Sequence, residues 1–196
     1  MSDIGRNLAG YVSLDEIGGG APYILAAGQG QHQRVSGSFR SLLARAEDTN
    51  GHVGVALLGG DTAAPTAAHY HRQTVEAVYV LDGIVRVWQD DQKGTRIVRD
   101  LQPGDFGLLP PGWTHAWAFA ENRTRFLSWC APGGFEGIFD HLDPETLTTA
   151  EGLHATESLF DVVWLPEVEI ALPSENPVYA AQSDGHRRVL NPPAAT

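Results

Sequence analysis

The chain has 196 residues, with 13 Lys and Arg against 24 Asp and Glu, and a formal net charge of −11 at pH 7. Hydrophobic residues make up 42% and charged residues 19%, which is typical of a globular protein with a sizeable core. So acidic a chain repels phosphate backbones and anionic lipids, and we expect neither nucleic acid nor membrane as a partner. The single cysteine, Cys130, excludes an internal disulfide and is predicted to be buried.

The N-terminal segment has no apolar run of signal-peptide length, and no stretch approaches the roughly 20 apolar residues of a membrane helix. We therefore expect a cytoplasmic protein. Residues 1–20 are predicted to be an N-terminal arm and residues 21–132 a single β domain. Residues 133–196 are predicted to form C-terminal helices and an extended tail that pack on this domain.

Short runs of β-branched and aromatic residues, separated by Gly, Pro and Asp turns, fill the middle of the chain. The predicted strands lie at 52–58, 76–81, 84–89, 95–101, 105–110, 115–119 and 124–129. Such regular spacing is typical of an all-β sandwich or barrel. Within the third run, Val85 and Val87 alternate with Arg86 and Trp88, so we expect the two pairs on opposite faces.

Helical periodicity begins only after about residue 133. Phe135, Ile138, Phe139 and Leu142 follow the i, i+3, i+4, i+7 spacing of one helix face. Asp143-Pro144 then has the sequence of an N-cap and a first helical residue, and predicts a second short helix that continues to about residue 153. The fold class that follows is an antiparallel jelly roll with short C-terminal helices.

The segment HYHRQTVEAVYVLDG, residues 69–83, concentrates groups that could bind a metal ion. His69 and His71 point to the same side of a strand, because side chains alternate along it. Glu76 lies at the end of an inward stripe with Val78 and Val80, where a charge is costly to bury unless it is paired or bound to a metal.

A third histidine comes from GDFGLLPPGWTH, residues 104–115, in which His115 begins a strand that can lie beside the one carrying His69. Three imidazoles and one carboxylate form an N₃O ligand set for a divalent metal. A lone strand histidine is usually a packed or surface residue, and an HxH pair alone is ambiguous; the combination favours a metal site. The remaining histidines are interpreted as structural or exposed: His32, His52, His141, His154 and His186.

The two segments resemble the paired motifs of the cupin superfamily. The first reads HxH, four residues, E, six residues, G, and the second reads G, five residues, PxG, two residues, H. Ala63 and Phe119 stand where cupins often have glycine and asparagine. The flanking segments APYILAAGQGQHQRVSG and APGGFEGIFDHL are similar to single-domain quercetinases, the flavonol 2,4-dioxygenases of this superfamily. The resemblance covers roughly residues 20–145.

The resemblance implies a cupin jelly roll and a metal-dependent dioxygenase that opens the central ring of a flavonol with O2 and releases carbon monoxide. His69, His71, His115 and Glu76 would hold one divalent ion, which is Ni, Mn, Fe, Co or Cu, with Zn as a substitute. Glu76 would also take the proton of the substrate's 3-hydroxyl group. Monocupins often pair through their sheets, so we expect a homodimer.

Flat apolar walls suit a polyphenol, and five aromatic residues are candidates for them: Trp117, Phe119, Phe135, Phe139 and Tyr79. A purely structural role in the core is the commoner one for each of these residues. The alternative function is a cupin isomerase, lyase or cyclase that uses the metal as a Lewis acid without O2. A binding cupin without activity is disfavoured, because all four ligands are present.

Overall fold

The computed structural model describes residues 20–35, 38–141 and 149–168. Its strands are β1 (Gln31–Val35), β2 (Ser38–Ala44), β3 (Gly54–Gly60), β4 (His69–Tyr70), β5 (Val75–Asp82), β6 (Val85–Asp90), β7 (Arg96–Leu101), β8 (Phe106–Leu109), β9 (Thr114–Phe119), β10 (Thr124–Ala131) and β11 (Val163–Trp164). Its helices are the 3₁₀ helices η1 (Ala46–Thr49) and η2 (Phe135–Asp140) and the α-helix α2 (Ala150–Thr156). None of the helices in these ranges is long and apolar enough to cross a membrane.

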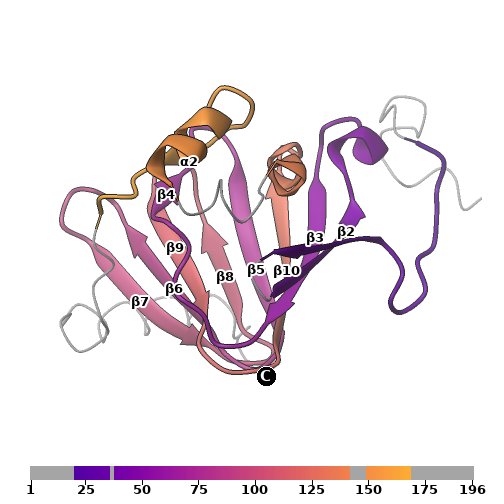
Figure 1. Cartoon of the computed structure of the whole chain (residues 1–196), viewed down its shortest axis with the longest axis horizontal. Coiled ribbons are helices and arrows are strands. Elements are labelled where there is room, and N and C mark those ends of the chain that lie inside the picture. Colours follow the sequence, from indigo (N-terminus) through magenta and orange to yellow (C-terminus); the bar gives the residue numbers. More distant parts are fainter. Residues whose placement is uncertain (1–19, 36–37, 142–148, 169–196) are drawn as a thin grey trace, which may run out of the picture.

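The described strands form two antiparallel sheets that face each other (Figure 1). The strand order is β1-β2-β3-β10-β5-β8 in the six-stranded sheet and β11-β4-β9-β6-β7 in the five-stranded sheet. Neighbours such as β10 and β3, or β4 and β9, are far apart in sequence, so the chain crosses repeatedly between the sheets. The predicted antiparallel jelly-roll architecture is confirmed, and all seven predicted strand runs correspond to strands.

The main core lies between the two sheets, where inward side chains of both sheets meet. Val85 and Val87 belong to this core, whereas Trp88 packs in a separate cluster with Val98 and Ala116. The predicted alternation along β6 is therefore confirmed. Burying one aliphatic side chain of this kind contributes roughly 1.5–3 kcal/mol, so the inward rows hold the strands in register.

The C-terminal helices differ from the prediction. The periodic segment that begins at Phe135 forms only the six-residue 3₁₀ helix η2, and the predicted Asp143-Pro144 helix start lies outside the described residues. The α-helix instead begins at Ala150, where the side chain of Thr149 accepts a hydrogen bond of 3.1 Å from the Gly152 N–H. Strands β1 and β2 were not predicted, since QHQRV and SFRSLLA lack a clean apolar alternation.

The segment that contains α2 and β11 covers one end of the five-stranded sheet. Val163 and Trp164 of β11 pair with Tyr70 and His69 of β4, and Figure 1 shows α2 above this strand. A second hydrophobic cluster joins this segment to η2; it contains Ile138, Leu153, Val162 and Trp164. The proposed domain boundaries near residues 20 and 132 remain predictions.

Candidate metal centre

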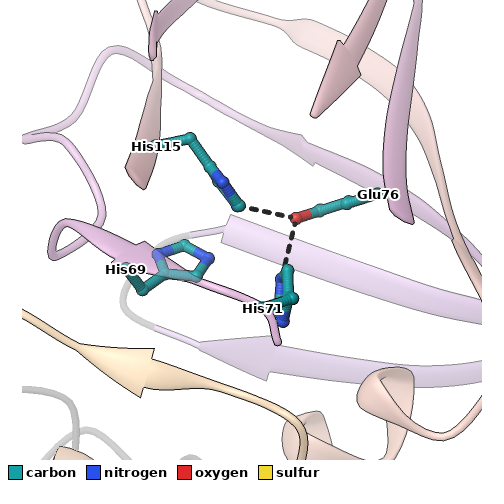
Figure 2. Close-up of side chains that lie close together, drawn as sticks. All are labelled: His69, His71, Glu76 and His115. Carbon is teal, nitrogen blue, oxygen red and sulfur yellow. Dashed lines mark ion pairs between the residues drawn. The ribbon is translucent and has the colours of Figure 1, made fainter. Parts of the chain in front are cut away.

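Four side chains from β4, the turn after it, β5 and β9 meet at the covered end of the barrel. His69 and His115 are directly paired residues of β4 and β9, which explains why residues 46 positions apart in sequence become neighbours. His71 follows β4, and Glu76 lies near the start of β5. The ligand-type atoms of all four residues lie within 4.8 Å of one another, and Figure 2 shows the side chains pointing toward one another.

The cluster is closed to solvent and leaves polar atoms without partners. The exposed fractions of its residues are 3% for His69, 0% for His71, 4% for Glu76 and 2% for His115. Oε2 of Glu76 lies 3.5 Å from Nε2 of His71 and 3.3 Å from Nε2 of His115, and none of these three atoms has a hydrogen-bond partner among the described residues (Figure 2). Buried polar atoms are almost always satisfied, so three orphan atoms around one point fit a bound cation.

The far side of each imidazole is fixed by a backbone carbonyl. Nδ1 of His69 bonds to the Ala67 carbonyl at 2.8 Å, and Nδ1 of His115 bonds to the Trp113 carbonyl at 3.0 Å. Nδ1 of His71 bonds to the carbonyl of Asp161. A carbonyl can only accept, so Nδ1 must carry the proton, and in each neutral ring the lone pair is on Nε2. This is the tautomer that a metal ligand needs.

Burial and the mutual contacts of the four groups set their protonation. Burial lowers the pKa of His69 well below its ordinary value of 6.5, and His115 and His71 lower it further. Burial alone would raise the pKa of Glu76, but His115 and His71 outweigh this effect and hold it well below 4.5. The pKa of His71 is raised, because its contact with Glu76 outweighs burial. Glu76 is therefore a carboxylate at neutral pH, and an ion competes with a proton on His71.

Aromatic rings surround the histidines. The ring of Phe135, from η2, meets the His71 ring edge-on at 4.3 Å between centroids. Trp164, from β11, lies 4.6 Å from the His69 ring, with a tilt of 43° between the ring planes. These rings exclude water from the cluster and lower the local dielectric constant, which strengthens any interaction between an ion and its ligands.

Comparisons with known proteins agree with this geometry. Residues 55–130, which include all four clustered residues, match the family described as the cupin domain, Cupin_2. These residues form a cupin domain. The chain is also 30% identical over 138 residues, 69% of its length, to a protein named quercetin 2,3-dioxygenase from Bacillus subtilis (strain 168).

A second relative has the same name. Over 81 residues, 41% of this chain, the identity to quercetin 2,3-dioxygenase from Aspergillus japonicus is 30%. The matched region spans 40% of the Bacillus protein and 23% of the Aspergillus protein, so it corresponds to less than half of either relative. The resemblance of this chain to quercetinases is thus established at the level of sequence.

Solved structures support the fold. KdgF from Halomonas sp. superimposes with a TM-score of 0.50 at 20% identity, and the match covers 59% of this chain and 98% of that one. Oxalate decarboxylase from Bacillus subtilis gives a TM-score of 0.51 at 16% identity, over 75% of this chain and 42% of that one. At such identities, the likeness shows only that the fold is shared.

The cupin barrel holds a small cavity beside the cluster. Its lining comes from β3, β5, β10 and η2 and consists of Gly54, Ala56, Glu76, Ser128, Cys130, Phe135, Glu136 and Phe139. Ser128 donates a hydrogen bond of 3.0 Å to Oε1 of Glu76, which leaves Oε2 as the atom that faces the histidines. Cys130 is buried as predicted, and burial raises the pKa of its thiol, with the neighbouring carboxylates Glu76 and Glu136 adding to the effect.

The five aromatic residues predicted to line a substrate pocket lie in three different places. Phe135 and Phe139 line the cavity that contains Glu76. Trp117 and Phe119 are in the core between the sheets, 5.3 Å apart between ring centroids. Tyr79 is 38% exposed and lies one residue out of step with Val78 and Val80, on the outer face of β5. Substrate contact remains a prediction for all five residues.

Two residues near the cluster were missed from the sequence. Asp161 supplies the carbonyl that holds His71, and Trp164 packs on His69. Both belong to a segment far along the chain from the first motif, since Asp161 lies 90 positions after His71. No motif marks this segment, and only the pairing of β11 with β4 brings it to the cluster.

Proposed function

We propose that this cupin is a metal-dependent dioxygenase of the quercetinase type, which cleaves a flavonol or a similar enolisable aromatic substrate with O2. The observation that carries the proposal is a buried site at which the imidazoles of three histidines and one carboxylate oxygen of Glu76 converge. The names of the two relatives at 30% identity supply the choice of reaction.

The residues fit a divalent ion such as Ni, Mn, Fe, Co or Cu. His69, His71, His115 and Glu76 would hold it, since imidazole and carboxylate suit these metals and four protein ligands leave coordination positions open. When bound, the ion supplies Lewis acidity and a fixed anchor for the substrate oxygens. Three backbone carbonyls keep the imidazoles oriented without the ion, so the site is preorganised.

Glu76 is the residue placed to move a proton. Oε1 of Glu76 is held by the Ser128 hydroxyl, whereas Oε2 points to the cluster, where a substrate hydroxyl would bind. We assign Oε2 as the acceptor of the 3-hydroxyl proton. Phe135 and Phe139, which line the cavity, would flank a planar substrate and keep bulk water from the enolate.

The test is oxygen uptake with quercetin, using full-length protein reconstituted separately with Ni, Mn, Fe, Co and Cu. Uptake with carbon monoxide release is expected for at least one metal, and it should vanish in His71→Ala. His52→Ala is the matched control, because His52 is an exposed histidine outside the cluster. If the metal-loaded protein consumed no oxygen with any flavonol tested, the dioxygenase proposal would fail. Turnover of a substrate without oxygen would then favour a cupin isomerase, lyase or cyclase.

A further inference from the structure

Buried polar atoms without a partner occur in two groups. Among the described residues, six buried side-chain nitrogen and oxygen atoms have no hydrogen bond. Three of them belong to the candidate metal centre, on His71, Glu76 and His115. The other three are Nε and Nη1 of Arg40 and Oε1 of Gln33. Gln33 and Arg40 are directly paired residues of β1 and β2, so their side chains lie on the same face of the sheet.

Arg40 is a buried cation with no carboxylate partner among the residues that the structure describes. Its side chain points to the core side of β2, as does that of Leu42, and only 7% of it is exposed. Within the described ranges, its Nε and Nη1 atoms have no hydrogen-bond partner. Burial lowers its pKa, but only to about 10, so the guanidinium stays charged at neutral pH. Burying a charge without an oppositely charged partner is strongly unfavourable, which calls for a reason beyond packing.

The short helix η2 contacts both groups of buried polar atoms that lack a hydrogen-bond partner. The Arg40 guanidinium carbon lies 4.8 Å from the centre of the Phe139 ring, and Phe139 also lines the cavity that contains Glu76. Phe135, four residues earlier in η2, lies against His71. The cavity beneath η2 thus has Glu76 in its wall together with Phe139, and the Arg40 guanidinium packs on the ring of Phe139.

We propose that Arg40 and Gln33 form a second binding point, for an anionic oxygen (a carboxylate or a phenolate) on a planar ligand whose other end lies at the metal cluster. A guanidinium donates several N–H groups in one plane, which matches such an oxygen, and a cation–π contact with Phe139 holds it flat. Oε1 of Gln33 then accepts from a hydroxyl on the same ligand. The proposal deepens the proposed function, on which it rests only in taking this cavity as the substrate site.

Small probe anions test the site without relying on turnover. We would measure binding of benzoate and 4-nitrophenolate to the full-length, metal-containing protein by calorimetry and thermal shift, with the neutral analogues benzamide and 4-nitroanisole as comparators. At least one anion is expected to bind about tenfold or more tightly than its neutral analogue. The anion that does so distinguishes a carboxylate site from a phenolate site.

Arg40→Met should abolish this preference while metal content stays unchanged, and Arg125→Met is the matched control, since Arg125 is a half-exposed arginine paired with Asp82. An anion held by the metal alone would bind Arg40→Met and wild type equally, and this result would overturn the proposal. So would equal binding of the charged and neutral probes by wild type. Should Arg40→Met not fold, Arg40→Lys decides: it keeps the charge but loses the planar donors, and unchanged anion affinity would refute the role of the guanidinium.

Discussion

Replacing Asp161 by alanine is expected to loosen the metal centre, although the Asp161 side chain is not one of its ligands. The carboxylate accepts hydrogen bonds from the backbone N–H groups of Arg72, Gln73 and Thr74, at 3.0, 2.9 and 2.8 Å. It also accepts from the Thr74 hydroxyl at 2.9 Å, while its own backbone carbonyl holds His71. The loop between His71 and Glu76 is thus fixed by one residue from the C-terminal segment.

The magnitude follows from these four bonds. A hydrogen bond to a charged group contributes about 1.5–3 kcal/mol when buried, and partial solvent exposure of the carboxylate reduces each bond to less than this. We expect Asp161→Ala to lower the free energy of unfolding by about 3 kcal/mol, which corresponds to about 6–12 °C in melting temperature for a domain of this size. The backbone carbonyl that holds His71 is kept in this variant, but the loop that follows His71 is no longer anchored to the Asp161 segment, so metal affinity should fall about tenfold.

Two assays check this prediction: thermal unfolding with and without chelator, and metal competition against a chromophoric chelator. Asp91→Ala is the control, since Asp91 also accepts from backbone N–H groups, those of Lys93 and Thr95, but in the turn between β6 and β7. This control should lose a little stability and no metal affinity. Wild-type metal affinity in Asp161→Ala would show that the loop keeps its shape unaided, and the reasoning would be wrong.

The same carboxylate predicts a pH dependence. Partial burial would raise the pKa of Asp161, but the N–H groups of Gln73, Thr74 and Arg72 and the Thr74 hydroxyl outweigh it and lower the pKa below 3.8. A lowered pKa in the folded state means that the stabilisation is complete above 3.8 and is lost as the pH falls through the folded-state value. The stability difference between wild type and Asp161→Asn should therefore be constant near neutrality and shrink only in strong acid.

Three further predictions concern the cluster and its surroundings. Removing the metal with chelator should lower the melting temperature, and re-adding it at about 100 times its Kd should restore about 2.7 kcal/mol; no change with metal would argue against a bound ion. Apparent metal affinity should rise as the pH increases through the raised pKa of His71, and a pH-independent titration would contradict this. Cys130 should resist a thiol reagent in the native protein and react after denaturation, whereas rapid native labelling would show that the cavity is open.

The parts that could be predicted from the sequence are those fixed by local spacing. The alternation in IVRVW defines the two faces of β6. The five-residue spacing from His71 to Glu76 predicts that the two side chains meet, because only one short turn separates them. The 3₁₀ helix η2 was predicted as the start of a longer α-helix, because apolar residues at i, i+3 and i+4 occur in both helix types. The parts that were missed depend on long-range pairing: β1 with β2, β11 with β4, and Asp161 with the loop after His71.

Two buried glutamates line the same cavity, and their hydrogen bonds distinguish a structural carboxylate from one that is available to bind an ion. Both oxygens of Glu136 are used: Oε1 accepts from the Ala46 N–H at 2.6 Å and Oε2 from the Gly134 N–H at 2.7 Å. Gly54 leaves the space for this carboxylate, since a Cβ there would come within 1.9 Å of it. Glu136 therefore has a structural role, because its hydrogen bonds anchor η2. Glu76, equally buried, keeps one oxygen without a hydrogen-bond partner in the described part of the chain, facing Nε2 of His71 and of His115, and a bound ion or a proton on His71 would satisfy it.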